Sequence, residues 1–294
     1  MTPGDSGRLD ARASGLAILA MAILGGSYTA GKIALHDLPV FGLLALRMAI
    51  TTVTLGAYAA LTRLPLLQTG RSAAYVLAQT GFFLVSQVSL FIGLTMTGAG
   101  RAAILFNMQP FFTLLLLPLW VPAERIGLRR WLGTIAAFGG VALVLVERGT
   151  AGGSLLGDAL CLLAALGWSG NVILNKRMPR EVNSAALIFW NVAAAIPVVA
   201  VLALALEGGA TWHFSASAVA SLLYLGVVAA GLGFVLIVWL VRSYSASRVN
   251  VFVFLSPVFG VLIGWLLLAE PISLQQALGA LGVAAGILIV STER

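Results

Sequence analysis

Ten long apolar stretches, joined by short connections, constrain this chain more than any other feature of its sequence. A helix needs about 20 mostly apolar residues to cross the hydrocarbon core of a bilayer. Hydrophobic residues make up 60% of the chain and charged residues 9%, against about 45–50% and about 25% in soluble domains. The sequence therefore predicts an all-α polytopic membrane protein. The predicted transmembrane helices cover residues 15–35, 40–61, 73–95, 99–121, 131–146, 155–175, 184–206, 216–240, 244–268 and 273–291.

The same composition excludes several other classes of protein. The apolar runs are unbroken, whereas the strands of a membrane β-barrel alternate between apolar and polar residues. Cys161 is the one cysteine, so an internal disulfide and a cysteine metal cage are impossible, and we predict neither a metal site nor a cofactor. The phosphate-binding pattern G-x-x-x-x-G-K-[ST] does not occur in the sequence, so the chain has no such loop for ATP.

The placement of the basic residues predicts the orientation of the chain in the bilayer. The net charge of +7 comes from Lys and Arg residues that cluster in the short connections, which favours membrane topology over nucleic-acid binding. Cytoplasmic loops carry an excess of these residues. With residues 1–14 as a short cytoplasmic tail, most of the basic residues fall on the cytoplasmic side. We therefore expect both termini in the cytoplasm and the protein in a bacterial-type inner membrane.

The two halves of the chain resemble each other at several ordered positions. The segment Arg101–Pro110 at the start of the fourth predicted helix matches Arg248–Pro257 at the start of the ninth, with Arg and Pro at the same spacing. The segment Glu124–Arg130 matches Glu270–Gln276 in the same way. Three basic residues of the first loop are replaced by Pro and Gln in the second, as expected if the two loops lie on opposite sides of the membrane.

Each half contains five predicted helices, and an odd number places the second copy upside down in the membrane. The first repeat covers residues 15–146 and the second covers residues 155–294. Inverted repeats of this kind are typical of secondary transporters, whose substrate site lies at the interface of the repeats.

On these features the chain resembles the EamA-type transporters of the drug/metabolite transporter superfamily. The residues that carry the resemblance are Leu24–Tyr28, Pro39 with Arg47, Gln109 with Pro110, and Glu124 and Glu270, each followed by a Gly-rich helix. Within the superfamily the chain is similar to YddG-like exporters of aromatic and other neutral amino acids. The resemblance implies a central cavity lined by the first, third, fourth, sixth, eighth and ninth helices, and export of small metabolites.

Neutral polar and aromatic side chains inside the predicted helices are the candidates for lining that cavity. A polar group in hydrocarbon needs a partner, so the alternative is that each bonds between helices without touching a solute. Uncharged polar groups beside aromatic rings suit a neutral or zwitterionic solute with an apolar side chain. The candidates are Ser27, Tyr28, Gln79, Phe83, Ser86, Gln87, Asn107, Gln109, Trp168, Ser169, Asn171, Tyr224, Phe252 and Ser256.

Two prolines lie at matching positions of the fourth and ninth predicted helices. Pro110 and Pro257 each remove a backbone donor and would clash with the carbonyl four residues earlier, at Phe106 and Val253. We predict that they form a symmetry-related pair of bends that act as hinges for opening either side. The alternative is that each produces a static kink.

Charged residues inside the predicted helices are few. Lys32 lies near the outer end of the first helix and can reach water, and Arg47 lies in a helix that the resemblance places at the periphery, so we expect structural roles for both. No acidic residue falls in the middle of a predicted helix, and Asp158 comes nearest. Because proton-driven transporters use carboxylates or histidines within the membrane, we expect weak or no direct proton coupling.

These features favour a secondary transporter that exports small metabolites, most of all neutral or aromatic amino acids. The alternatives are an exporter of another small solute, such as a nucleobase, a sugar or a drug-like compound, or a channel. An enzyme is disfavoured, because Ser169 lacks the spacing of a nucleophile elbow and no histidine lies in a predicted helix. The expected partners are a small-molecule substrate and the lipid bilayer. Small residues such as Gly140 and Gly282 either pack helices within one chain or form a dimer face, so both a monomer and a homodimer remain open.

Overall fold

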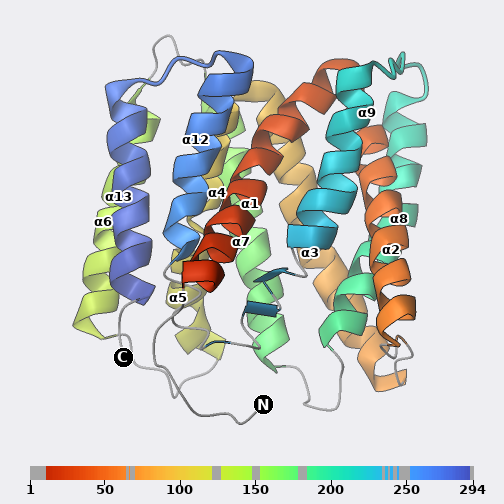
Figure 1. Ribbon diagram of the computed structural model, residues 1–294, viewed down its shortest axis with the longest axis horizontal. Helices are drawn as coiled ribbons and strands as arrows, with labels where there is room; N and C mark the ends of the chain where they lie inside the picture. The colour runs from red at the N-terminus through yellow and green to blue at the C-terminus, as the bar shows by residue number, and fades with distance from the viewer. Residues whose placement is uncertain are drawn as a thin grey trace.

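The computed structural model describes residues 11–63, 66, 70–120, 127–147, 153–177, 184–233, 236–237, 239–240, 244 and 252–291. Within these ranges every regular element is a helix (Figure 1). The first half contains α1 (Ala11–Asp37), α2 (Val40–Thr62), α3 (Gly70–Met96), α4 (Ala99–Phe106), α5 (Gln109–Trp120) and α6 (Leu128–Val146). The second half contains α7 (Leu155–Arg177), α8 (Ser184–Glu207), α9 (Ala216–Leu223), the π-helical η1 (Tyr224–Gly233), the 3₁₀ turn η2 (Phe252–Phe254), α12 (Leu255–Leu268) and α13 (Leu274–Ser291).

The ten predicted helices are all present, and three of them are divided. Among the described residues, seven helical segments are long and apolar enough to cross a membrane, and three more are shorter and apolar. The fourth predicted helix is α4 followed by α5, the eighth is α9 followed by η1, and the described part of the ninth is η2 followed by α12. Of the predicted tail over residues 1–14, residues 1–10 lie outside the described ranges and α1 already begins at Ala11. Glu124 and Arg248 of the repeat comparison also lie outside them.

Contacts at one end of the bundle show that the second half is inverted. Lys32, in the last two turns of α1, donates a hydrogen bond from Nζ to the carbonyl oxygen of Thr97. Just before the start of α7, the backbone N–H of Ser154 donates to the carbonyl oxygen of Met96. The end of α1 and the start of α7 therefore lie at the same end, and these two equivalent helices run in opposite directions (Figure 1).

The helices pack in the pairs that a two-fold axis in the membrane plane would produce. Three pairs join equivalent helices of the two halves: α2 with α8, α4 with α12, and α6 with α13. The largest of the remaining contacts also join the two halves, since α1 packs on α12, α9 and η1, whereas α7 packs on α4, α5 and α3. The core is therefore built at the seam between the halves, with α1 and α7 at its centre.

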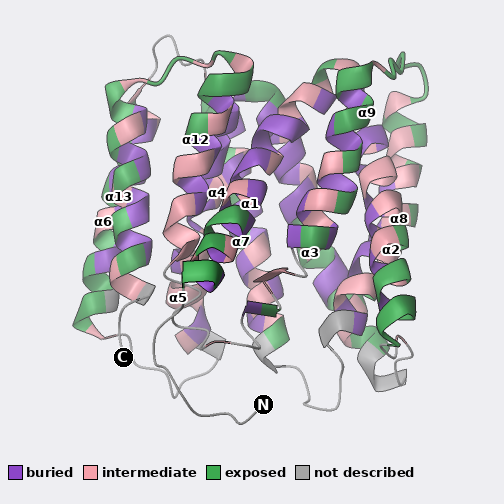
Figure 2. Cartoon of the chain, viewed as in Figure 1, coloured by how far each residue is buried: buried purple, intermediate pink, exposed green. Residues whose placement is uncertain are grey.

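The exposed faces belong to helices at the outside of the bundle. Figure 2 shows exposed residues along the outer sides of α6, α13, α2 and α8, and buried residues where the central helices meet. Many of these exposed side chains are large and apolar, including Leu61, Leu132, Ile135, Leu204 and Leu281. Apolar side chains on the outside of a helix bundle suit hydrocarbon rather than water, so the protein is an integral membrane protein.

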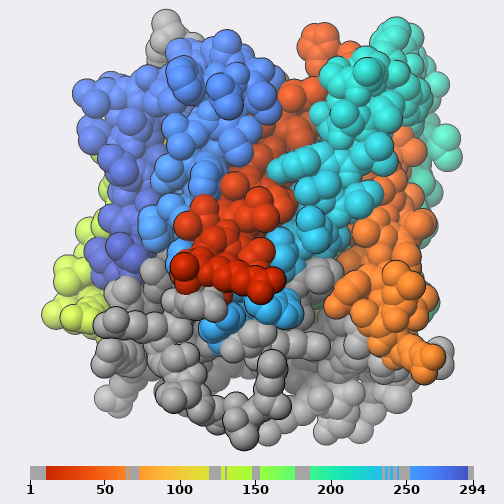
Figure 3. Space-filling view, viewed as in Figure 1, coloured from red at the N-terminus to blue at the C-terminus, as the bar shows by residue number. Residues whose placement is uncertain are grey.

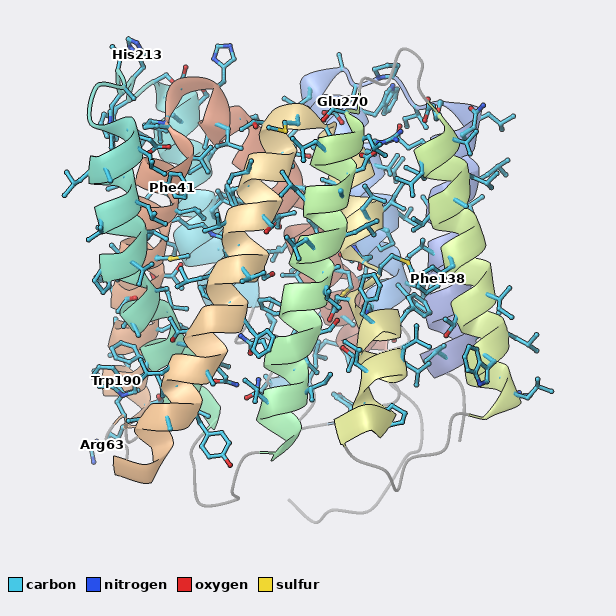
Figure 4. All side chains as sticks on the ribbon, turned by 180° about the vertical axis from the view of Figure 1, so that it is seen from behind. Phe41, Arg63, Phe138, Trp190, His213 and Glu270 are labelled. Atoms are coloured by element: carbon cyan, nitrogen blue, oxygen red, sulfur yellow. The ribbon has the colours of Figure 1, made fainter. Side chains whose placement is uncertain are left out.

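Two glutamates hold the starts of helices at the end of the bundle that carries Glu270. Glu207 accepts hydrogen bonds from the N–H groups of Phe41 and Gly42 in the first turn of α2, each over 2.9 Å. Glu270 accepts from the N–H groups of Ala99 and Gly100 in the first turn of α4, over 2.8 and 3.2 Å. The first N–H groups of a helix have no partner within it, and a carboxylate there also complements the helix dipole. Figure 4 labels Phe41 and Glu270 toward this end and Arg63 and Trp190 at the opposite one.

Candidate functional site

A cavity of about 320 Å³ lies at the centre of the bundle, between the two halves. Helices α1 to α5 line it from the first half, and α7, η1, η2 and α12 line it from the second. Figure 3 shows the start of α1 lying between the α12–α13 pair and the α9–η1 segment on one face of the molecule. Apolar side chains form most of the wall, and none of the described residues on the wall is acidic. The described lining residues are Met21, Leu24, Ser27, Tyr28, Arg47, Gln87, Leu90, Phe91, Leu94, Phe106, Asn107, Gln109, Trp168, Leu225, Ile237, Val253 and Ser256.

Half of the fourteen predicted site residues lie on this wall. Two come from α1, one from α3, two from the junction of α4 and α5, one from α7 and one from α12. Their side chains are all uncharged, so the neutral polar groups expected from the sequence are gathered from both halves around one space. The seven residues are Ser27, Tyr28, Gln87, Asn107, Gln109, Trp168 and Ser256.

Four polar candidates lie away from the wall and are buried between helices. Ser169 donates to the carbonyl oxygens of Gln109 and Ala165, over 2.7 and 2.9 Å, and so ties α7 to α5. Asn171 donates from Nδ2 to the carbonyl oxygen of Gln79, which ties α7 to α3. Ser86 is fully buried, and its hydroxyl has no partner among the described residues. Gln79, Ser86 and Asn171 therefore belong to the packed interface of α3 with α7, and Ser169 to the contact of α7 with α5, rather than to the cavity wall.

The other three candidates support the wall or lie elsewhere. Tyr224 donates its hydroxyl to the carbonyl oxygen of Ile23 over 2.8 Å, so it joins η1 to α1. The ring of Phe83 packs against that of Trp168 with centroids 6.5 Å apart, behind the wall. Phe252 packs with Ala13, Ala17 and Leu240 in a separate small cluster.

Aromatic rings form one continuous side of the cavity. The ring centroids of Tyr28 and Phe106 are 6.0 Å apart, and those of Phe106 and Trp168 are 6.1 Å apart, with the rings inclined at 60° in both pairs. Inclined pairs at this separation are favourable arrangements for aromatic rings. The three rings come from α1, α4 and α7, so they bring both halves of the molecule onto a single apolar surface.

The two prolines are placed differently from the expectation of bent continuous helices. The chain leaves helical geometry at Asn107 and Met108, and Pro110 then lies in the first turn of α5. A proline is tolerated there because its missing N–H would have no partner in the helix anyway. The predicted clash with the carbonyl of Phe106 is avoided by this break. Asn107 turns its side chain back and donates from Nδ2 to the carbonyl oxygen of Ala103 over 2.7 Å.

The second half repeats this arrangement. Pro257 lies in the first turn of α12, directly after the 3₁₀ turn Phe252–Phe254. The clash expected at Val253 is avoided in the same way, because the 3₁₀ turn changes the backbone path before the proline. The cavity wall includes a residue next to each break, Gln109 and Ser256. In place of the predicted pair of bends, the described chain has an interruption between α4 and α5 before Pro110 and a 3₁₀ turn that leads into α12 before Pro257.

Arg47 is a wall residue that was not among the predicted site residues. It was expected to be structural because the resemblance placed α2 at the periphery, yet its side chain lines the cavity. Its Nη1 donates to Oε1 of Gln87 over 2.8 Å, and its guanidinium carbon lies 5.1 Å from the centroid of the Phe91 ring. The available signal was the charge itself, because an ionisable residue within a span is a functional candidate by default.

A second buried arginine has a different environment. Arg101 is 2% exposed and donates from Nε and Nη2 to the carboxylate of Asp158, over 2.8 and 2.6 Å. Its Nη1 donates to the carbonyl oxygen of Glu147, whose carboxylate lies 3.8 Å away. The acidic residue nearest the middle of a predicted helix, Asp158, is therefore engaged in this ion pair and is absent from the cavity wall.

The sequence is similar to those of known transporters over nearly its whole length. The EamA-like transporter family profile matches residues 12–146 and 155–292. A protein of Escherichia coli (strain K12) named "Probable amino-acid metabolite efflux pump" is 31% identical over 287 residues, which cover 93% of each chain. A protein of the same name from Salmonella typhimurium is 30% identical, with 93% of each chain covered.

Two further similarities are weaker in sequence. The "Uncharacterized transporter YoaV" of Bacillus subtilis is 23% identical, covering 93% of this chain and 95% of that protein. A solved structure described as "Crystal structure of protein" has a TM-score of 0.68 at 18% identity, covering 95% of this chain and 96% of that chain, which shows a shared fold. Because the family profile matches both halves, this chain belongs to the EamA-like transporter family.

Proposed function

We propose that this protein is a secondary transporter that exports small metabolites, and that its first substrates are amino acids with apolar side chains. The observation that carries the proposal is the cavity between the inverted halves, whose wall combines uncharged polar groups with a connected set of three aromatic rings, those of Tyr28, Phe106 and Trp168. Its volume of about 320 Å³ is near the lower limit of the about 300–1,000 Å³ usual for small-molecule sites. A site of this size suits a single small metabolite.

The transport cycle follows from the symmetry of the two halves. Inverted repeats allow two related conformations, in which the same site faces opposite sides of the membrane in turn. In this protein the segments α4–α5 and η2–α12, each of which changes its helical geometry before a proline, lie at equivalent positions of the two halves and both contribute to the wall. We propose that they change their bend in opposite senses as the site is exposed to one side and then the other.

The relatives support the choice of amino acids as first substrates. Two relatives, 31% and 30% identical, carry names that refer to amino-acid metabolite efflux. The aromatic side of the cavity would accept an apolar side chain, and the neutral amides and hydroxyls would hydrogen-bond the polar end of the solute. Both termini are placed in the cytoplasm of a bacterial-type cell in this proposal, so that export proceeds away from the end that carries them.

A counterflow experiment tests the proposal. Liposomes that contain the purified protein are loaded with an unlabelled solute. Uptake of the same solute in labelled form is then followed, for each member of a panel of amino acids, nucleobases and sugars. We expect saturable exchange of phenylalanine, leucine or similar amino acids, and no exchange in protein-free liposomes. Exchange restricted to nucleobases or sugars would overturn the amino-acid assignment, and single-channel currents would overturn the carrier mechanism.

The same liposomes test the source of energy. None of the described residues on the cavity wall is acidic, and Asp158 is paired with Arg101, so the described residues offer the cavity no free carboxylate that could carry a proton. We propose that net flux follows the gradient of the solute. Uptake should therefore be the same with and without an imposed pH gradient, and strict dependence on that gradient would contradict the proposal.

A further inference from the structure

Arg47 presents more hydrogen-bond donors to the cavity than the described residues of the protein satisfy. A guanidinium carries five N–H donors, and the Arg47 side chain makes one hydrogen bond to the described part of the protein, to Oε1 of Gln87. No carboxylate of a described residue lies within ion-pair distance of it. The side chain is half-buried and lines the cavity. Its remaining donors therefore require an acceptor from the contents of the cavity.

Two basic side chains near the ends of the described helices, unlike Arg47, have carboxylate partners. Arg101 has the carboxylates of Asp158 and Glu147. Lys32 has the carboxylate of Glu270 at 3.3 Å. Each of these two described cations, which connect helices, is thus paired with a carboxylate. Arg47 has an amide oxygen and an aromatic ring instead.

The surroundings of Arg47 fix its position without cancelling its charge. The Phe91 ring attracts the guanidinium through its negative face, and Gln87 holds one terminal nitrogen. Both partners are buried residues of α3, so the guanidinium is anchored to one rigid helix. A fixed arginine fork is suited to a planar carboxylate, which can accept two parallel hydrogen bonds. Less ordering is then required when the anion binds.

We propose that Arg47 binds the carboxylate of the transported solute. The described wall carries this one positive charge and no negative charge, and an uncompensated charge in a low-dielectric site favours a counter-ion. The remainder of the solute would extend toward the rings of Tyr28, Phe106 and Trp168. This inference rests on the proposed transport function and narrows its substrate class to small carboxylic acids, including amino acids but excluding amines without an acid group.

The simpler role for Arg47 is to connect α2 to α3 through Gln87 and Phe91. Both roles predict that removing Arg47 lowers activity or stability, so loss of transport alone does not separate them. The preference of the transporter for an acid over its uncharged or cationic analogue does separate the two roles, because a residue that only connects helices would not change that preference. The test is therefore built on a set of related compounds.

The experiment measures inhibition of labelled phenylalanine counterflow by three unlabelled compounds. Phenylalanine has both charged groups, N-acetylphenylalanine keeps the carboxylate alone, and phenylalaninamide keeps the ammonium alone. In the wild-type protein we expect the two carboxylates to inhibit at concentrations about tenfold or more below the amide, as a charge-assisted pair would give. Equal inhibition by acid and amide in the wild type would overturn the proposal without any variant.

Two substitutions and a matched control complete the test. Arg47→Gln should reduce the preference for acid over amide by about tenfold or more, and Arg47→Lys should keep a reduced preference, because Lys retains the charge but not the planar fork. Arg63→Gln makes the same charge change at the exposed end of the same helix and should behave as wild type. Thermal unfolding in detergent shows whether each variant is folded.

The outcomes separate the two proposals. If the wild type exchanges phenylalanine and Arg47→Gln keeps the full preference for acids, Arg47 only connects helices and the present inference is wrong while the transport proposal stands. If the wild type exchanges only solutes that lack a carboxylate, both the amino-acid assignment and the role of Arg47 are wrong. If Arg47→Gln does not fold, the wild-type compound series and Arg47→Lys decide the question.

Discussion

Single charged residues in this protein take their roles from the partners that the fold provides. Arg101 lies near the start of α4 and donates hydrogen bonds to the carboxylate of Asp158 in α7, so this ion pair joins the two halves of the molecule. Both side chains are about 2% to 3% exposed. Removing one member of a buried pair leaves an uncompensated charge in the interior. The resulting loss of stability is larger than the stability that the intact pair adds in comparison with two apolar residues.

At this scale we predict that Asp158→Asn destabilises the protein strongly. The substitution keeps the shape of the side chain but removes the negative charge opposite Arg101. Because the Glu147 carboxylate still lies 3.8 Å from Arg101, we expect a loss near the lower end of the about 3–5 kcal/mol typical of broken buried pairs. The free energy of unfolding, measured by denaturant titration in detergent micelles, checks this value.

The double variant Arg101→Gln with Asp158→Asn serves as the control for that prediction. It removes both charges of the Arg101–Asp158 pair, so Arg101 no longer carries an uncompensated charge, and part of the lost stability should return. The recovery is incomplete because the Glu147 carboxylate, 3.8 Å from Arg101 in the wild type, then loses its partner. If Asp158→Asn alone were as stable as the wild type, the ion pair would not be important for holding α4 to α7.

At the scale of whole helices, close packing occurs where glycine stands in place of a residue with a larger side chain. α6 and α13 pack along their lengths, and Gly140 of α6 lies against the backbone of α13. A Cβ added at Gly140 would lie 2.7 Å from the carbonyl oxygen of Gly279, 3.0 Å from the N atom of Val283 and 3.1 Å from the Cα of Gly282. These atoms are backbone, so they cannot move aside without shifting a helix. The small residues noted in the sequence are thus used for packing within one chain.

We therefore predict that Gly140→Ala separates α6 from α13 and lowers the melting temperature of the purified protein. Gly139→Ala is a matched control one residue away, because a Cβ there has no neighbouring atom within 4 Å. Alanine favours a helix over glycine by about 1 kcal/mol, so the control should be unchanged or slightly more stable. The prediction fails if the two variants melt at the same temperature.

At the scale of the whole molecule, the inverted symmetry gives each bend in a helix of the first half a counterpart in the equivalent helix of the second half. The break before Pro110 and the break before Pro257 are equivalent positions in two inverted halves. A change that straightens one half should favour opening to one side of the membrane, and the same change in the other half should favour the opposite side. The symmetry thus converts a local backbone property into a choice between two global states.

Pro110→Ala and Pro257→Ala should accordingly shift the balance between the two open states in opposite directions. Alanine restores the backbone N–H and removes the ring that keeps the preceding turn from joining the helix. Labelling of a cysteine introduced at Ser27 of the cavity wall, in a Cys161→Ala background, measures access from each side of membrane vesicles. Cys161 is the one native cysteine and is fully buried, and its replacement leaves the introduced cysteine as the one thiol to be labelled. Equal labelling in both variants and the parent would refute the prediction.

The sequence could predict the spans and their number because the bilayer imposes a length and a polarity on every helix that crosses it. It could also predict the inversion, since an odd number of spans in each half leaves no other arrangement. It could name polar residues within the spans, but only half of those chosen lie on the cavity wall. Ser169 and Tyr224 instead bond between helices, because hydropathy does not report how far each helix is rotated about its axis.

The sequence by itself determined the membrane-spanning class, the ten helices and the two inverted halves, since all of these follow from local hydrophobicity and from repetition along the chain. The tertiary structure alone decided that α2 contributes Arg47 to the cavity, that Asp158 is neutralised by Arg101, and that each proline follows a break instead of bending a continuous helix. These outcomes depend on contacts between helices far apart in the chain. Each helix can satisfy the bilayer in many rotations, and only the packing against its neighbours selects one.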